Sequence, residues 1–318
     1  FSVSAFYSVQ TDISSSYYNT GYMNNYYNSL YGGGYGNYNY NNYENYLDPD
    51  KSIKMYGLSV GWGKRLSWPD DYFTLSAELS YQRYILKEWQ YFPVTNGRCN
   101  NISLNLTLAR NSTDNPIYPR QGSDFSLSVQ VTPPYSLFDG VDYGSYNLSN
   151  QDDVNKMHKW VEYHKWKLKS KTYTAFTSGA KAPVLMTRAE FGILGHFNKN
   201  KKSPFETFDM GGDGMTGYSS YATESVALRG YENSSLTPYR GMEGYAYTRL
   251  GLELRYPLML ETSTSIYALG FLEAGNAWND IKDFNPFELK RSAGVGVRIF
   301  LPMRGMKGID WADAIDQI

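Results

Sequence analysis

Alternation of apolar and polar residues with a period of two is the dominant pattern of this chain. Over residues 73–82, Phe, Leu, Ala, Leu and Tyr alternate with Thr, Ser, Glu, Ser and Gln. The same pattern recurs over residues 102–109, 125–131 and 292–299. Successive side chains of a β-strand point to opposite faces, so each segment is predicted to be a strand whose two faces meet different environments.

The predicted strands are long, and aromatic residues stand at their ends. These residues are Trp62, Trp68, Tyr72, Tyr81, Tyr84, Trp89, Tyr256 and Trp278. Aromatic girdles at the two water–lipid interfaces are typical of a transmembrane β-barrel. A soluble β-sandwich also alternates, but its strands are usually shorter and less aromatic at their ends. The pattern therefore favours an all-β fold, a transmembrane antiparallel β-barrel, and about eleven strands can be counted.

The cost of placing a charge in hydrocarbon decides which face of each strand is the lipid face. The apolar positions expected to point to lipid include Leu75, Leu104, Leu127, Val295 and Val297. The charged positions expected to point to the lumen include Glu78, Arg188, Glu190, Glu253 and Arg298. A stripe of four lysines shares one face of a further strand, at Lys165, Lys167, Lys169 and Lys171. These lysines must face the lumen or stand on an extension of the strand above the membrane.

Composition agrees with a barrel and excludes several other classes. The chain has 31 tyrosines and 17% aromatic residues, and its mean hydropathy is −0.52. It contains no apolar run of about 18 residues, so no membrane helix is predicted. The net charge of −1 provides no field that would attract nucleic acid. The single cysteine, Cys99, excludes an internal disulfide framework.

Sequence motifs for catalysis and cofactor binding are absent. The three histidines, His158, His164 and His196, have no carboxylate or cysteine at metal-ligand spacing. There is no nucleophile elbow, phosphate loop or dinucleotide fingerprint. The sequence therefore predicts a protein that is not an enzyme, with no catalytic residue, metal or cofactor.

Two segments are predicted to be unusual loops. Of the 30 residues from 17 to 46, 20 are tyrosine or asparagine, which predicts an external loop without a core of its own. A second loop of roughly 30 residues, 198–227, is rich in glycine and far longer than a typical connection. It leads directly into Leu228, Arg229, Gly230 and Tyr231.

The arginine of this segment has two candidate partners on later strands, Glu253 and Glu273. A guanidinium fork can hold two carboxylates at once, and a glycine lets the backbone approach a wall closely. We therefore expect the loop to fold back into the lumen, with Arg229 within salt-bridge distance of one or both glutamates. Tyr231 is expected to pack beside this contact.

Four motifs occur in a fixed order between residues 55 and 312. The first is the turn at residues 115–123, which contains Tyr118, Pro119 and Gly122, and the second is the Arg229 segment. The third and fourth are the strands with Glu253 and with residues 271–278. In this order they resemble the motifs of outer-membrane insertases of the BamA type. The richness in tyrosine and asparagine is similar to members from Bacteroidetes.

The chain departs from that family at several positions. The family commonly has aspartate where Glu273 stands, so this side chain is one methylene longer and its contact with Arg229 could be displaced. Leu228 and Tyr231 stand where the family has valine and phenylalanine. The family has periplasmic POTRA domains before a barrel of about 16 strands. The resemblance thus implies that residues 1–318 are the C-terminal barrel domain, without POTRA domains and without the first few strands and the last.

The resemblance also implies a function and a location. BamA-like proteins fold and insert other β-barrels into the outer membrane of Gram-negative bacteria. The implied partners are the lipid bilayer, unfolded outer-membrane protein clients, and accessory lipoproteins or surface proteins. The alternatives are a related transport barrel, such as a two-partner secretion transporter or a translocation-assembly paralogue, and a passive porin.

Overall fold

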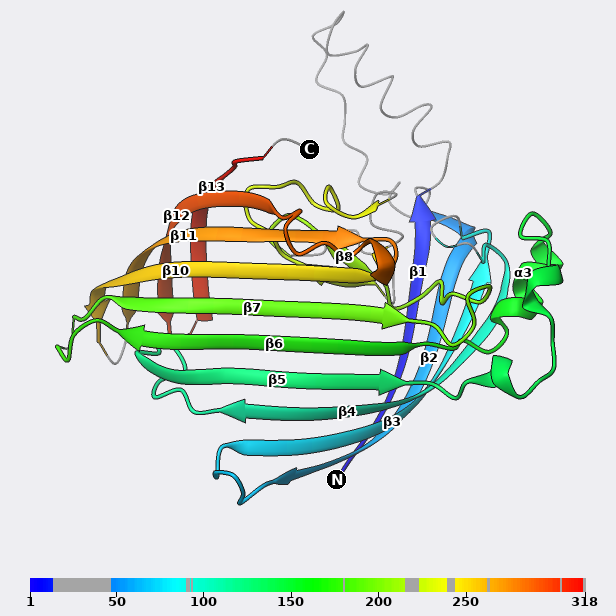
Figure 1. The fold of residues 1–318 in the computed structure, drawn as a ribbon, viewed down its shortest axis with the longest axis horizontal. Coiled ribbons are helices and arrows are strands. Elements are labelled where there is room, and N and C mark those ends of the chain that lie inside the picture. Colours follow the sequence, from blue (N-terminus) through cyan, green and yellow to red (C-terminus); the bar gives the residue numbers. More distant parts are fainter. Residues whose placement is uncertain are drawn as a thin grey trace, which may run out of the picture.

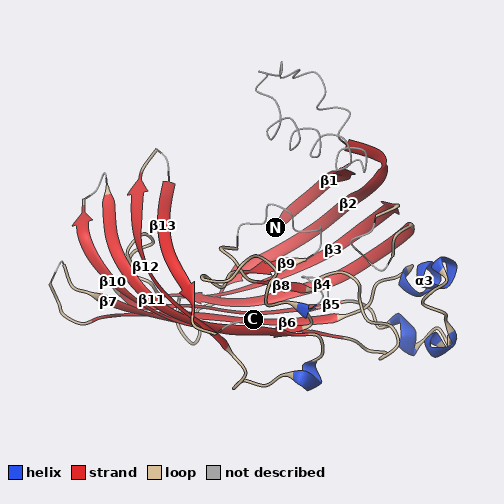
Figure 2. Cartoon of the chain, turned by 90° about the horizontal axis from the view of Figure 1, so that it is seen from above, coloured by secondary structure: helices blue, strands red, loops and turns tan. Residues whose placement is uncertain are grey.

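One strongly curved antiparallel sheet dominates the fold (Figure 1). The structure is a computed structural model that describes residues 1–13, 47–89, 92, 94–179, 181–214, 223–238, 244–261, 264–303 and 305–316. In this part of the chain the sheet has eleven strands, and each pairs with its neighbour in antiparallel register. Figure 2 shows the sheet as an open trough, with β1 and β13 at its two rims. The predicted tyrosine- and asparagine-rich loop, 17–46, lies outside the described residues.

The strands follow one another in the sheet in chain order. They are β1 (Ser2–Ile13), β2 (Leu47–Arg65), β3 (Phe73–Lys87), β4 (Gly97–Asn111), β5 (Gln121–Val131), β6 (His164–Ala175), β7 (Val184–Gly195), β10 (Ala246–Leu260), β11 (Ser265–Trp278), β12 (Lys290–Leu301) and β13 (Gly305–Ala314). Between β7 and β10 the chain leaves the sheet. There β8 (Phe208–Met210) and β9 (Glu224–Val226) form a small parallel pair inside the trough (Figure 2). The predicted antiparallel architecture thus holds for the main sheet, and the parallel pair belongs to the loop.

The connections differ sharply between the two ends of the sheet. Short turns join the strands at one end, at residues 66–72, 112–120, 176–183, 261–264 and 302–304. Longer loops join most of the strands at the other end, and one of these carries η3 (Tyr135–Leu137), η4 (Tyr143–Ser145) and α3 (Gln151–His158) (Figure 1). A later loop contains η5 (Ile281–Asp283). No helix in the described part of the chain is long and apolar enough to cross a membrane.

The outer face of the sheet is apolar, as the alternation predicts. Leucines and valines of several strands are largely exposed on it, including Leu79 (55%), Leu252 (49%), Leu272 (54%) and Val295 (56%). The register places the predicted lipid-facing residues on this surface. Leu75 pairs with Leu108, which pairs with Leu127 on the next strand.

The inner face carries the charged positions that the alternation assigns to the lumen. Glu190 and Glu253 are buried, and Arg188 and Arg298 form ion pairs there. Glu78 pairs with Asn105 in a row that continues through Gln130 to Lys165. Because Lys165 is also buried on the inner side, the row places Glu78 on that side.

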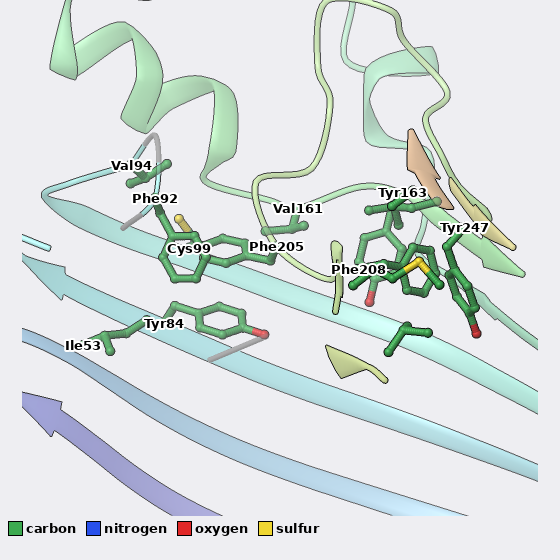
Figure 3. Close-up of a cluster of buried hydrophobic side chains, with 14 of the residues drawn as sticks. Ile53, Tyr84, Phe92, Val94, Cys99, Val161, Tyr163, Phe205, Phe208 and Tyr247 are labelled. Carbon is green, nitrogen blue, oxygen red and sulfur yellow. The ribbon is translucent and has the colours of Figure 1, made fainter. Parts of the chain in front are cut away.

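The main hydrophobic core lies on the inner side, at the end of the sheet with the long loops. Tyr84 of β3 stacks on Phe205 of the β7–β10 loop, with ring centroids 4.4 Å apart (Figure 3). Phe92 packs edge-on against Phe205, with ring centroids 4.9 Å apart. The expectation that Tyr84, Trp89 and Trp278 belong to a lipid-facing girdle is therefore wrong, because Tyr84 and Trp89 are buried in this core and Trp278 is buried against Phe284. Loops fold over the inner wall at this end, so aromatic residues there meet protein instead of lipid.

Candidate functional site

The loop between β7 and β10 forms a folded unit on the inner wall of the sheet. Its β8–β9 pair is extended by two backbone hydrogen bonds to Gly212: Leu228 N–H donates to the Gly212 carbonyl (3.0 Å), and Gly212 N–H donates to the Tyr231 carbonyl (2.9 Å). Gly211 and Gly212 have φ of +135° and +68°, conformations that glycine adopts readily. The segment 228–231 is therefore held in a defined shape by the loop itself. We call residues 196–245 the lumen loop.

Glycines of the wall let the lumen loop come close. A Cβ atom at Gly275 of β11 would lie 2.5 Å from Met210 Cε and 3.4 Å from Leu228 Cδ1. A Cβ atom at Gly192 of β7 would lie 2.8 Å from Phe208 Cζ. Met210, Leu228 and Phe208 are fully buried, so the loop packs directly against the wall at these two glycines.

Arg229 lies between two wall carboxylates that the sequence singles out. Its Nη2 is 2.8 Å from Glu273 Oε1 and 3.1 Å from Glu253 Oε2. Its backbone N–H also donates to Glu273 Oε2 at 3.0 Å, and its guanidinium lies 3.5 Å above the centre of the Phe271 ring. The extra methylene of Glu273 does not displace the contact, because the carboxylate binds both the backbone and the side chain of Arg229.

A third carboxylate, which was not singled out from the sequence, completes the contact. Arg229 Nη1 is 3.2 Å from Asp310 Oδ2, and Asp310 also accepts from Arg298 Nη2 at 2.7 Å. Asp310 stands between Ile309 and Trp311, so the period of two was sufficient to place it on the inner face. The missed residue lies on β13, so the arginine connects three strands of the wall.

Further arginines surround the same carboxylates. Arg249 Nη2 is 3.0 Å from Glu273 Oε1, and Arg255 Nε is 2.7 Å from Glu253 Oε1. Arg188 contacts both Glu190 and Glu273 at 3.4 Å. Within the described residues this arginine–carboxylate network joins five arginines to four acids. Its members are Arg188, Arg229, Arg249, Arg255, Arg298, Glu190, Glu253, Glu273 and Asp310.

The two residues after Arg229 fit tightly against β12 and the end of β13. Gly230 has φ of +91°, and a Cβ atom there would lie 2.9 Å from Ser292 Cβ and 3.0 Å from the Asp313 carbonyl oxygen. Tyr231 is buried, and its hydroxyl donates to the Arg291 carbonyl at 2.7 Å. A glycine is therefore required at position 230 both by conformation and by space.

The predicted turn motif lies at the opposite end of the same wall. Tyr118 is 3% exposed, and its hydroxyl lies 3.3 Å from the carbonyl oxygens of Ala182 and Arg255. Pro119 is buried beside it, and Gly122 has φ of +99°, where a side chain would collide with the Ser112 carbonyl. The turn thus closes over the inner wall next to Arg255, a member of the arginine–carboxylate network.

Comparison with known proteins shows the family of this chain. The family model of the Omp85 superfamily domain matches residues 1–315. The chain belongs to the Omp85 superfamily.

Among solved structures, this Omp85 chain is similar to BamA from Haemophilus ducreyi lacking POTRA domains 1–3, with a TM-score of 0.58 and 17% sequence identity. The match covers 84% of this chain and 52% of that one, so the chain spans about half the length of the solved structure. No curated protein matches the chain. The predicted fold, an antiparallel transmembrane β-barrel of the BamA type, is confirmed by this likeness together with the family match.

Removal of the Tyr118 side chain is expected to destabilise the Omp85 barrel. Tyr118→Ala empties a buried site packed against Tyr267, with ring centroids 5.1 Å apart, and should cost about 3–5 kcal/mol. Tyr118→Phe keeps the ring and loses one long hydrogen bond shared between two carbonyl groups, so it should cost about 1 kcal/mol. Urea unfolding of the protein in detergent, followed by tryptophan fluorescence, measures both costs. Equal midpoints for the two variants would contradict a packing role.

The lysine stripe faces the lumen, which settles the alternatives left open by the sequence. Lys165 is 3% exposed, and its Nζ is 3.1 Å from Glu224 Oε2 of the lumen loop. Lys167 and Lys169 bind the same carboxylate at 3.0 Å and 3.4 Å. Burial alone would raise the pKa of Glu224, but the three lysines outweigh burial and hold this pKa at about 2.

The low pKa of Glu224 predicts how the loop responds to acid. A carboxyl whose pKa falls on folding stabilises the folded state above its ordinary pKa, 4.5 here, and loses that contribution as the pH drops toward about 2. The groups that face Glu224 are Lys165, Lys167 and Lys169 of β6 and Tyr247 of β10. We expect amide protection of residues 224–226 to be constant from pH 7 to pH 5 and to weaken below pH 4.5. Hydrogen-exchange mass spectrometry, corrected for intrinsic rates, measures this, and Glu224→Gln should remove the acid step.

Proposed function

We propose that this chain is the transmembrane barrel of an outer-membrane protein assembly factor, which folds and inserts β-barrel proteins into the outer membrane of a Gram-negative bacterium. The observation that carries the proposal is the seating of Arg229 between Glu253 and Glu273 inside an Omp85 barrel. A passive pore does not require a lumen loop that is bound to three strands of the wall by buried charges. The likeness of the fold to BamA supports the same function.

The lumen loop acts as a brace for the wall in this proposal. Arg229 contacts β10 through Glu253, β11 through Glu273 and β13 through Asp310. Tyr231 adds a contact with the start of β12 through the Arg291 carbonyl. Together these contacts keep the wall rigid, so that strand separation is confined to a seam elsewhere in the barrel.

Insertion itself needs no covalent chemistry. An unpaired strand edge is a template for an incoming strand, and the backbone hydrogen bonds that form at the seam satisfy polar groups that lipid cannot. The proposed partners are therefore the lipid bilayer and unfolded outer-membrane protein clients, together with POTRA domains and accessory lipoproteins or surface proteins of the assembly complex. We propose no enzymatic activity, no cofactor and no nucleic-acid partner.

Reconstitution tests the proposal. The full-length protein is placed in liposomes of outer-membrane lipids, and a urea-unfolded client barrel is added. The expected result is client that resists protease and shows heat-modifiable mobility on a gel, formed faster than in empty liposomes. Ion conductance without client insertion would indicate a porin. Passage of a soluble secreted partner without insertion would indicate a transport barrel of the secretion or translocation-assembly type.

A further inference from the structure

We infer that Glu224 is a second anchor of the lumen loop. This residue binds the loop to the lysine stripe of β6, and it thereby positions the Arg229 segment on β10, β11 and β13. Glu224 begins β9, and three lysine ammonium groups lie within 3.4 Å of its oxygens. Its side chain is 23% exposed, while that of Lys165 is 3% exposed.

The buried lysine is enclosed by the loop from several sides. Lys165 Nζ is 3.5 Å from Glu206 Oε2 and 4.6 Å from the centre of the Phe208 ring, in addition to its contact with Glu224. Glu206 and Phe208 both lie in the first half of the lumen loop, whereas Glu224 lies in the second half. A charge buried this deeply requires close partners, and the lumen loop supplies both carboxylates that contact Lys165, Glu206 and Glu224.

The two anchors stand at opposite ends of one short segment. Glu224 binds β6, while Arg229 binds β10, β11 and β13, and β7 lies between them. From β6 to β11 there are three strand spacings, which amount to about 14 Å. Five residues in extended conformation reach at most about 17 Å. The segment 224–229 is therefore long enough to connect both sites but too short to let the two ends move independently over the wall.

The polarity of the two anchors is reversed. At β6 the wall supplies the cations and the loop the carboxylate, and at β10, β11 and β13 the wall supplies the carboxylates and the loop the cation. A loop shifted to the wrong anchor would oppose like charges, which costs free energy. The arrangement thus selects one docked position. It also predicts that the loop stays on the wall when only one anchor is lost.

Hydrogen exchange on the full-length protein in detergent tests the second anchor with Glu224→Gln, Arg229→Ala and the double variant. The amides to follow are those that hold the loop together, Glu224, Leu228 and Gly212. Each single variant should raise exchange at its own end by a few fold. The double variant should raise exchange at all three amides at least about tenfold over either single variant, because no ionic anchor is left.

A matched control is available on the same loop. Glu232→Gln makes the same change at an exposed glutamate and should exchange like the wild type. If Glu224→Gln also exchanges like the wild type, or the double variant behaves like Arg229→Ala alone, Glu224 is not an anchor. Gel mobility with and without heating shows that each barrel is folded.

The consequence for activity rests on the proposed function, and the two claims can fail separately. Client insertion is measured on the same preparations. A wild-type protein that inserts no clients, although its loop responds to the substitutions as expected, would overturn the proposed function and leave the second anchor standing. A loop that stays docked in the double variant would overturn the second anchor alone.

Discussion

Arg229→Ala is expected to slow the insertion of client barrels at least about tenfold, while the variant barrel itself still folds. The substitution leaves Glu253 and Glu273, with side chains 5% and 1% exposed, without the loop guanidinium. Breaking a buried ion pair costs about 3–5 kcal/mol. Arg249 and Arg188 still accompany Glu273, so the lower end of that range applies. A tenfold change corresponds to about 1.4 kcal/mol, so the loss is large enough to loosen this end of the loop while Glu224 still holds the other end.

The measurement is the rate of client insertion into liposomes, with two further variants for comparison. Arg229→Lys keeps the charge but cannot bind two carboxylates as a planar fork, so it should retain only part of the activity. Lys199→Ala removes an exposed cation from the same loop and should be as active as the wild type. Wild-type insertion by Arg229→Ala would show that the docked arginine has no part in assembly.

Gly275→Val is expected to be as damaging as the loss of Arg229, although it changes no charge. A Cβ atom at this position would lie 2.5 Å from Met210 Cε and 2.8 Å from the Thr248 carbonyl oxygen. The larger side chain must push Met210 and Leu228 off the wall, which moves Arg229 away from its carboxylates. We therefore expect client insertion to fall about tenfold or more and amide exchange of residue 228 to rise.

A second glycine of the same strand provides the control. Gly270 lies on β11 but faces outward, and a Cβ atom there would lie 4.0 Å from its nearest neighbour, the Gly294 carbonyl oxygen. Gly270→Val should leave insertion and loop exchange unchanged, since it adds an apolar group to an apolar face. If Gly275→Val inserts clients as fast as Gly270→Val, close approach of the loop to the wall is not required for function.

The face of each inner-wall residue followed from the sequence alone. Glu253 lies between Leu252 and Leu254. Because side chains of a strand alternate between its two faces, Glu253 must point inward if both leucines point to lipid. The same reasoning was sufficient for Asp310 and for Arg249 and Arg255, which share the parity of Glu253. The lumen position of Arg229 could also be predicted, because its two candidate partners, Glu253 and Glu273, lie on strands that turn these carboxylates inward.

Contacts between segments far apart in the chain were decided only by the tertiary structure. The period of two shows that Lys165 faces inward, but it does not show that Glu224, 59 positions later, is the carboxylate that reaches it. Tyr84 and Trp89 stand at strand ends like girdle residues, yet Phe205 and its neighbours cover them from the inside. Alternation reports the polarity on the two sides of a strand, a local property of consecutive residues. Which loop covers the inner side depends on the path of the chain through the lumen, and that path is set by packing among distant residues.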